Sequence, residues 1–256
     1  MRRYGGTLIH SSRDRDGVLE VVDAHGVRSL HFGTAPRQSA MSLTEPDGLE
    51  LAYSRAMLTA LVFIATPERV LLLGLGGGSL ARFLLCHYPR CRIDAVERRA
   101  DVPPIAHGYF GLPRDARLSV HIAEAFEYCD AAVRNIAAEY DLILVDAYDQ
   151  RGMDESINAE EFFRACRDLL RPLGALSLNL WGTHKASLKH SCQLLQANYP
   201  GRAFKLPVPN KGNVIGLGLG SEFARPNLKD FIVRAHTLEI QLGLELPYFL
   251  RTLRSL

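Results

Sequence analysis

The pattern of apolar and polar residues predicts a sheet whose strands are joined by helices. Short apolar runs of strand length alternate with segments whose apolar residues recur at helical spacing. The expected strands are 70–73, 92–96, 118–122, 141–145 and 175–180, and the expected helices are 79–87, 125–138, 159–170 and 185–197. Such alternation is typical of a parallel sheet with helices on both faces and right-handed crossovers.

The two ends of the chain follow other patterns. Short alternating runs before residue 49 predict a small N-terminal β module over 1–48, and helical spacing over 49–64 predicts a helix that leads into a main domain over 49–256. Runs at 203–208 and 213–219 predict a hairpin that gives the sheet an antiparallel edge and seven strands in all. A Pro-Pro loop is expected after the second strand, and a helical tail is expected from Pro226.

Composition and charge exclude several classes of protein. The chain has 256 residues, 47% of them hydrophobic, and a net charge of +2, which is too mild to indicate a nucleic-acid or membrane-surface partner. Because no apolar segment has the length of a signal peptide or a membrane span, a cytoplasmic location is expected. The five cysteines have no CxxC spacing and the histidines have no metal-ligand spacing, so no metal site is expected.

A glycine-rich turn follows the first strand of the main domain. The stretch RVLLLGLGGGSL places Gly74, Gly76, Gly77 and Gly78 between an apolar run and the helix that opens at Ser79. Such a turn lets a ligand approach the backbone closely at a helix N-terminus. A dinucleotide fingerprint needs a third glycine where this chain has Ser79, and no Gly-Lys-Ser/Thr follows, so the spacing favours an adenosylmethionine-type loop.

Four acids follow the predicted strands: Glu97, Glu124, Asp146 and Asp149. The carboxyl ends of parallel strands meet at one edge of the sheet, where ligands bind. Glu97 has the position to accept hydrogen bonds from both hydroxyls of a ribose, and Glu124 can accept from an adenine amino group. Together with the glycine loop they predict a nucleoside site.

Several segments together resemble the spermidine synthase family. They are the glycine loop, the AVE that ends at Glu97, RLSVHIAEAFEY, EYDLILVDAYD, INAEEFF, LRPLGALSLNL and the upstream GLELAYSRAML, within roughly residues 35–220. The resemblance implies a Rossmann-like class I methyltransferase fold and a reaction in which an amine attacks a carbon beside the sulfonium of decarboxylated adenosylmethionine. Family members often form dimers, so a homodimer is expected.

The resemblance also implies roles for individual residues. The glycines Gly74, Gly76, Gly77 and Gly78 with Glu97 and Glu124 would bind the donor nucleoside. Asp146 would orient and deprotonate the amine, Asp149 would neighbour it in the acceptor site, and Tyr53 would be the gating tyrosine. The further substrate-binding candidates are Gln38, Arg55 and Tyr148.

The departures from the family pattern fall on the acceptor side. Gly77 stands where the family has an aspartate that binds the aminopropyl amine, and Arg55 stands where it has an acid. The segment from Pro207 to Gly212 replaces one that supplies an acceptor-binding tyrosine, and its Lys211 adds positive charge. Three functions therefore stay open at this point. They are aminopropyl transfer to a polyamine, methyl transfer from adenosylmethionine to another acceptor with Arg55 near the donor carboxylate, and nucleoside binding without turnover.

Overall fold

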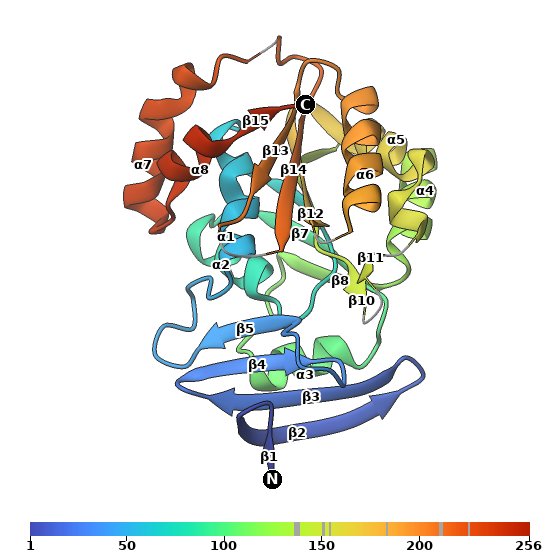
Figure 1. The fold of residues 1–256 in the computed structure, drawn as a ribbon, viewed down its shortest axis with the longest axis vertical. Coiled ribbons are helices and arrows are strands. Elements are labelled where there is room, and N and C mark those ends of the chain that lie inside the picture. Colours follow the sequence, from blue (N-terminus) through green and yellow to red (C-terminus); the bar gives the residue numbers. More distant parts are fainter. Residues whose placement is uncertain (136–138, 150–151, 154, 183, 210–211, 225) are drawn as a thin grey trace.

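The N-terminal part of the chain folds as an antiparallel meander in the computed structural model (Figure 1). The structure describes residues 1–135, 139–149, 152–153, 155–182, 184–209, 212–224 and 226–256, with the side chains of 148–155 left out. The five strands, in sheet order, are β1 (Arg2–Arg3), β2 (Gly6–Asp14), β3 (Gly17–Ala24), β4 (Val27–His31) and β5 (Ser39–Ser42). His25 and Gly26, with φ of 52° and 77°, form the tight turn between β3 and β4.

The main sheet has eight strands in the order β15-β13-β14-β12-β9-β6-β7-β8. Five neighbouring strands are parallel: β12 (Leu170–Trp181), β9 (Tyr140–Val145), β6 (Arg69–Leu73), β7 (Arg92–Glu97) and β8 (Leu118–Ile122). The predicted hairpin is β13 (Ala203–Pro207) and β14 (Asn213–Leu219), with β14 antiparallel to β12. All seven predicted strands are present, and β15 (Arg254–Ser255) adds an eighth that was not predicted.

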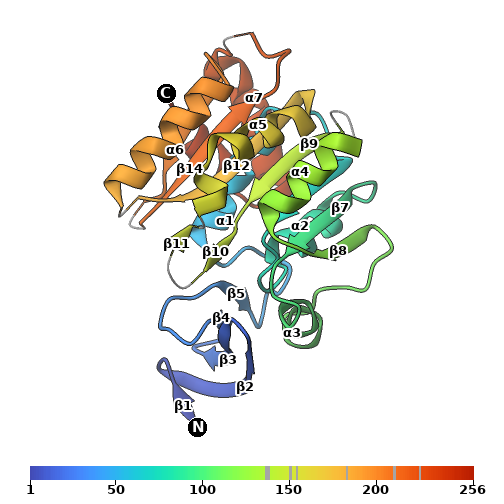
Figure 2. The same ribbon diagram turned by 90° about the vertical axis from the view of Figure 1, so that its right-hand side faces the viewer.

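Helices cover both faces of the main sheet (Figures 1 and 2). One face packs against α1 (Ala52–Met57), α2 (Ser79–His87), α7 (Ile232–Leu242) and α8 (Leu246–Thr252). The other packs against α4 (Ala125–Asn135), α5 (Glu160–Leu169) and α6 (Lys185–Asn198). The apolar stripe of the predicted C-terminal helix, from Leu238 to Phe249, is buried in the core of the chain.

Three elements differ from the sequence-based expectation. The predicted Pro-Pro loop is the helix α3 (Val102–Tyr109), because Pro103 and Pro104 lie in its first turn, where no backbone N–H is needed. The predicted helix over 49–64 is shorter, since α1 tightens into a 3-10 helix over Leu58–Val62 that contains the β-branched Thr59 and Val62. Strand β12 begins at Leu170 rather than 175, and an irregularity between Leu170 and Ala175 accommodates Pro172. Residues 136–138 of the helix predicted over 125–138 lie outside the described residues.

The N-terminal sheet is fixed to the main domain at the edge where the parallel strands end. Apolar residues of β3 and β4 pack on Val102, Ile105 and Phe110 at helix α3. Strand β5 contacts the start of α2, where the Ser79 hydroxyl lies 3.3 Å from the carbonyl oxygen of Ala40. The glycine loop therefore lies between the two sheets.

A short two-stranded ribbon of β10 (Tyr148–Asp149) and β11 (Gly152–Met153) follows β9, and a 3-10 turn over Glu155–Asn158 leads into α5.

Among the described residues, no helix is both long and apolar enough to cross a bilayer. No cluster of three or more potential metal ligands is found in that same part of the chain.

Candidate active site

The glycine loop lies where β6 approaches the ends of both neighbouring strands. The N–H of Gly74 donates to the Val96 carbonyl at 2.8 Å, and the N–H of Asp146 donates to the Leu73 carbonyl at 2.8 Å. Gly74 has φ of 95°, and a Cβ at this position would collide with the Asp146 carbonyl oxygen. Only glycine satisfies both conditions, so the residue allows the loop to approach the end of β9.

Glu97 holds the glycine loop through its carboxylate. One oxygen accepts hydrogen bonds from the N–H groups of Leu75 at 3.1 Å and Gly76 at 3.4 Å. The other accepts from the N–H of Arg99 at 2.9 Å, and the side chain is 8% exposed. Backbone groups on both sides of the carboxylate therefore fix its position at the end of β7.

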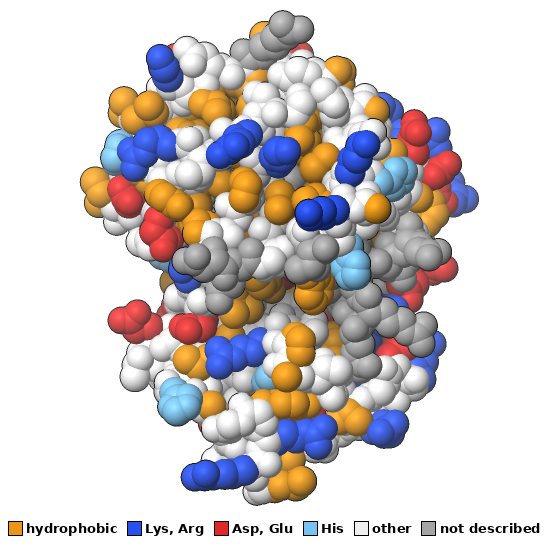
Figure 3. Space-filling view, in the orientation of Figure 1, with side chains coloured by type: hydrophobic (Ala, Val, Ile, Leu, Met, Phe, Trp, Pro, Cys, Tyr) orange, Lys and Arg blue, Asp and Glu red, His pale blue; other side chains and the backbone are white. Residues whose placement is uncertain are grey.

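A pocket with about 900 Å³ of space opens over this loop, and we call it the loop pocket. Its walls come from the N-terminal sheet, the glycine loop and the ends of β7, β8 and β9. The lining includes Phe32, Gln38, Ser39, Tyr53, Gly74, Leu75, Gly76, Ser79, Glu97, Arg98, Arg99, Glu124, Asp146 and Ile157. Figure 3 shows the surface drawn in between the N-terminal sheet and the main domain.

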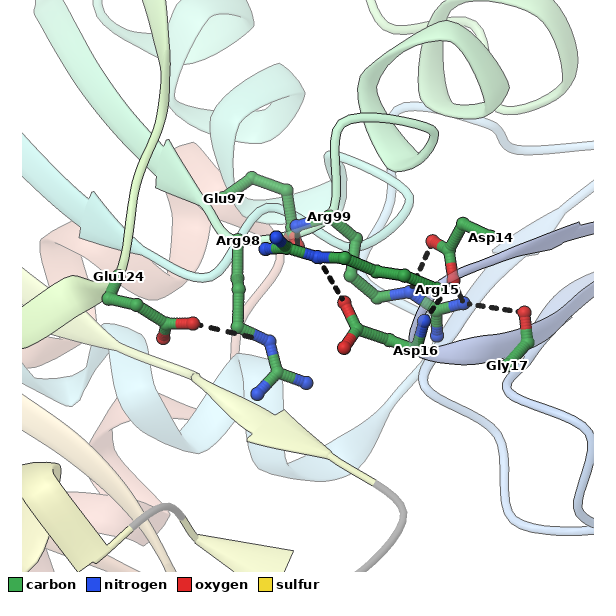
Figure 4. Close-up of polar contacts among 8 residues, drawn as sticks. All are labelled: Asp14, Arg15, Asp16, Gly17, Glu97, Arg98, Arg99 and Glu124. Atoms are coloured by element: carbon green, nitrogen blue, oxygen red, sulfur yellow. Dashed lines mark hydrogen bonds and ion pairs between the residues drawn. The ribbon is translucent and has the colours of Figure 1, made fainter.

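Two arginines that follow Glu97 shape one wall of the loop pocket (Figure 4). Arg98 pairs with Glu124 at 3.8 Å. Arg99 is 4% exposed and binds both carboxylate oxygens of Asp14 at 2.9 and 2.8 Å, with its guanidinium 4.4 Å from the Phe32 ring. Burial alone would raise the pKa of Asp14, but the hydrogen bonds from Arg99 lower it below its usual range. The tip of the β2–β3 hairpin is thus joined to the pocket by an ion pair.

Asp146 is held by side chains from two separate elements, and a third element supports one of them. The Tyr53 hydroxyl on α1 donates to one carboxylate oxygen at 3.0 Å, and the Asn179 amide on β12 donates to the other at 2.8 Å. The amide of Asn213 on β14 in turn donates to the Asn179 oxygen at 2.9 Å. This chain of donors fixes which way the Asp146 carboxylate points.

The environment of Asp146 changes its acidity in opposite directions. Burial raises its pKa above the ordinary aspartate value, and the hydrogen bonds from Asn179 and Tyr53 oppose that rise, with burial dominating. A carboxylate with a raised pKa is a better proton acceptor than an ordinary surface aspartate. The group is therefore suited to take a proton from a nucleophile.

A second hollow, with about 860 Å³ of space, meets the loop pocket at Asp146. We call it the Trp181 cleft. It is lined by Pro36, Arg37, Gln38, Leu51, Ala52, Tyr53, Asp146, Asn179, Trp181, Gly212 and Asn213. Gln38, Tyr53 and Asp146 line both spaces. A group bound in one space can thus meet a group bound in the other beside the Asp146 carboxylate.

The structure brings most of the predicted site residues together. Gly74, Gly76, Glu97, Glu124, Asp146, Tyr53 and Gln38 all line the loop pocket, whereas Gly77 and Gly78 do not. The backbone of Tyr148 and Asp149 forms β10 beside the site, but their side chains lie outside the described part of the chain, as does Lys211.

Arg55 is directed away from both spaces. Its guanidinium binds Glu245 at 3.2 Å and the carbonyl oxygens of Leu49 and Glu50 at 2.9 and 3.1 Å, and it lines neither pocket. This geometry gives no support to the expected contact between Arg55 and a donor carboxylate. Arg55 instead binds Glu245, which lies immediately before α8 and 190 positions away in the sequence.

Neighbouring side chains fill the space beside Gly77. A Cβ there would lie 2.7 Å from the Ser39 hydroxyl and 3.0 Å from the Phe110 ring. An aspartate at this position would require both side chains to move. The packing around Gly77 therefore leaves no space for the acid that the spermidine synthase pattern has here.

Three polar residues of the Trp181 cleft were not predicted from the sequence: Asn179, Asn213 and Arg37. Asn179 had a detectable signal, because it interrupts the apolar run of a buried strand and a buried amide needs partners. Asn213 and Arg37 had none, since a loop arginine and a polar residue at a strand start are common on any surface.

Comparisons with known proteins agree with this geometry. The family model described as "Spermine/spermidine synthase domain" matches residues 50–199. The polyamine aminopropyltransferase of Chromobacterium violaceum is 32% identical over 238 residues, which cover 93% of this chain and 89% of that protein.

Solved structures with the same fold include a probable spermidine synthase and a methyltransferase-like protein. A probable spermidine synthase from Corynebacterium glutamicum has a TM-score of 0.73 and 21% identity, covering 90% of this chain and 86% of that one. Human methyltransferase-like protein 13 in complex with SAH has a TM-score of 0.70 and 24% identity, covering 75% of this chain and 93% of that one.

Proposed function

The chain belongs to the spermine/spermidine synthase family, and we propose that it transfers an alkyl group from an adenosylmethionine-type donor to an amine. One observation carries the proposal: Asp146, oriented by Tyr53 and Asn179, lies where the loop pocket and the Trp181 cleft meet. A donor in the first space and an amine in the second would then react beside a proton acceptor.

The loop pocket suits the nucleoside part of such a donor. Leu75 and Gly76 lie in the loop at the pocket floor, where no bulky side chain separates Gly76 from the space. Glu97 would accept hydrogen bonds from the ribose hydroxyls, and Glu124 would face the adenine edge. These residue types match the polar groups of a nucleoside, which supports the fit.

The donor supplies an electrophilic carbon: as the nitrogen lone pair forms the new N–C bond, the C–S bond breaks and its electron pair makes the sulfonium a neutral thioether. The protein has two tasks. It aligns the amine with that carbon, and it removes a proton from the amine so that the nitrogen is neutral. We assign proton removal to Asp146 and the orientation of its carboxylate to Tyr53 and Asn179. We propose that Asp149 assists on the acceptor side, with Gln38 and Tyr148 as substrate contacts.

The transferred group is either aminopropyl, from decarboxylated adenosylmethionine, or methyl, from adenosylmethionine. The family and its aminopropyltransferase relatives favour the first, and polyamine synthesis would be its role. The glycine at position 77 favours the second, because adenosylmethionine carries an extra carboxylate that an aspartate there would repel, and the packing around Gly77 leaves no space for that acid. Nucleoside binding without turnover is the third candidate.

Calorimetry with adenosylmethionine, its decarboxylated form and methylthioadenosine tests the proposal. We expect binding of at least one at micromolar concentration, which corresponds to about 8 kcal/mol. Preference for the carboxylated donor would indicate methyl transfer. Preference for the decarboxylated donor, with spermidine formed from putrescine, would indicate aminopropyl transfer.

The same measurement can contradict the proposal. If none of the three ligands bound, the nucleoside site itself would be wrong. If a donor bound but no amine gave a thioether product, with donor binding unchanged in Asp146→Asn, the chain would be a binding protein.

The assembly and location of the chain stay predictions. We propose a homodimer in the cytoplasm that acts on small molecules and needs no nucleic acid, membrane or metal. The exposed apolar side chains Val233 and Ile240 on α7 support a contact between copies.

A further inference from the structure

The Trp181 cleft has an unusual charge balance for a space that would accept polyamines. Among its described lining residues, Asp146 is the only acidic side chain and Arg37 is the only basic one. A diamine carries two positive charges at neutral pH, and each needs a carboxylate or several oxygen acceptors when it leaves water. Asp146 can meet one of the two charges, and no other described side chain of the cleft is an acid that could meet the second; the side chain of Asp149 lies outside the described residues.

Arg37 itself is available to a ligand. It lies on the segment between β4 and β5, and its side chain is exposed at the cleft. No carboxylate in the described part of the chain lies within ion-pair distance of its guanidinium. An arginine in this position repels a second ammonium group and attracts a carboxylate, which it can bind through two parallel N–H donors.

The rest of the Trp181 cleft is uncharged and has a polar part and an apolar part. Asn213 donates to Asn179, which in turn donates to Asp146, so both amides are committed to orienting that carboxylate. Leu51 and Ala52 and the exposed indole of Trp181 supply apolar contact area between the two charged ends. Such a surface suits a short methylene chain.

We propose that the acceptor is a small amine that also carries a carboxylate, with the amine at Asp146 and the carboxylate at Arg37. This inference rests on the proposed function, because it takes the Trp181 cleft as the acceptor side. It names a class of acceptor that differs from the diamines of the aminopropyltransferase relatives. Arg37 is then a specificity-determining residue.

Three amines of matched length test this assignment: 4-aminobutanoate, butylamine and 1,4-diaminobutane. Release of the thioether nucleoside measures turnover with each, whichever group is transferred. For the wild-type protein we expect the aminocarboxylate to exceed butylamine in kcat/KM by about three- to tenfold, and the diamine to be the poorest acceptor.

Substitutions of Arg37 separate its role from a general charge effect. In Arg37→Gln the advantage of 4-aminobutanoate over butylamine should fall to about onefold, and in Arg37→Glu the diamine should become the best of the three. Arg37→Lys should keep part of the preference. Arg251→Gln, which removes an exposed arginine from α8, should change none of the ratios. Calorimetry of donor binding shows whether each variant is folded, since Arg37 does not line the loop pocket.

The outcomes distinguish this inference from the proposed function. If the diamine were the best wild-type acceptor, or if Arg37→Gln left the ratios unchanged, the inference would be wrong while the alkyl transfer stood. If no amine gave product, calorimetry with the donor-bound protein decides. Binding of the aminocarboxylate that is lost in Arg37→Gln supports the inference, and binding of the diamine alone overturns it. Failure of every donor to bind contradicts the proposed function itself.

Discussion

The loop pocket and the Trp181 cleft hold their key carboxylates in different ways. Glu97 is fixed by three backbone N–H groups, which any residue except proline at positions 75, 76 and 99 would supply. Asp146 is fixed by the side chains of Tyr53 and Asn179, which substitution can remove. The donor side is therefore built into the path of the chain, and the acceptor side is built from replaceable groups. A chain of this fold can change its acceptor without rebuilding its donor site.

The largest expected effect comes from Asp146→Asn. Asparagine keeps the shape of the side chain but cannot take a proton, so we expect turnover to fall by about 10²- to 10⁴-fold. Donor affinity measured by calorimetry should change little, which would separate the two spaces clearly.

The matched control for this variant is Asp168→Asn, which changes an exposed aspartate on α5. It should leave both turnover and donor binding unchanged. A loss of donor affinity in Asp146→Asn as large as the loss of turnover would mean that the two spaces are not independent.

Glu97→Gln should have the next largest effect, and this effect should fall on the loop pocket, where the donor binds. Both carboxylate oxygens accept backbone N–H groups, so an amide must turn its NH₂ toward one of these donors. We expect donor affinity to weaken by about 10- to 100-fold, measured by calorimetry. The order of acceptor preference should not change.

Glu124→Gln is the control. The amide retains an acceptor oxygen, and the ion pair that it loses with Arg98 is a long one, at 3.8 Å. Its effect on donor affinity should be about threefold or less. Equal losses in the two variants would remove the special role assigned to Glu97.

The smallest expected effect is a shift in the pH profile of Tyr53→Phe. The proton acceptor must be ionised, so the raised pKa of Asp146 already moves the acid limb of the activity profile above that of an ordinary aspartate. The Tyr53 hydroxyl lowers this pKa, and its removal should move the limb to still higher pH. Near neutral pH the rate should fall by about tenfold or less. A parallel loss at all pH values would instead indicate a purely steric role.

Much of the donor side could be predicted because it follows from local patterns. The glycine loop and Glu97 lie directly after predicted strands, and parallel strands bring their carboxyl ends to one edge. The same rule brought Asp146 to that edge, while a role for Tyr53 in the site was expected from the family resemblance alone. The Pro-Pro segment shows the limit of local rules, because prolines end a helix in its interior but are tolerated in its first turn.

The remaining features depend on partners that are far apart in the sequence. Arg55 turns toward Glu245, and Arg99 toward Asp14, contacts that span 190 and 85 positions respectively. The hydrogen bond between Asn213 and Asn179 exists because β14 inserts between β12 and β13. Periodicity and spacing carry no information on such contacts, so these contacts could not be derived from the sequence.

The ion pair between Arg99 and Asp14 has a consequence for how the two sheets depend on each other. Because the loop pocket has walls from both, a ligand that fills it is linked thermodynamically to their association. Each tenfold excess of ligand over its Kd then adds about 1.4 kcal/mol against separation of the sheets. The concentration of donor would in this way set how tightly the N-terminal sheet stays docked.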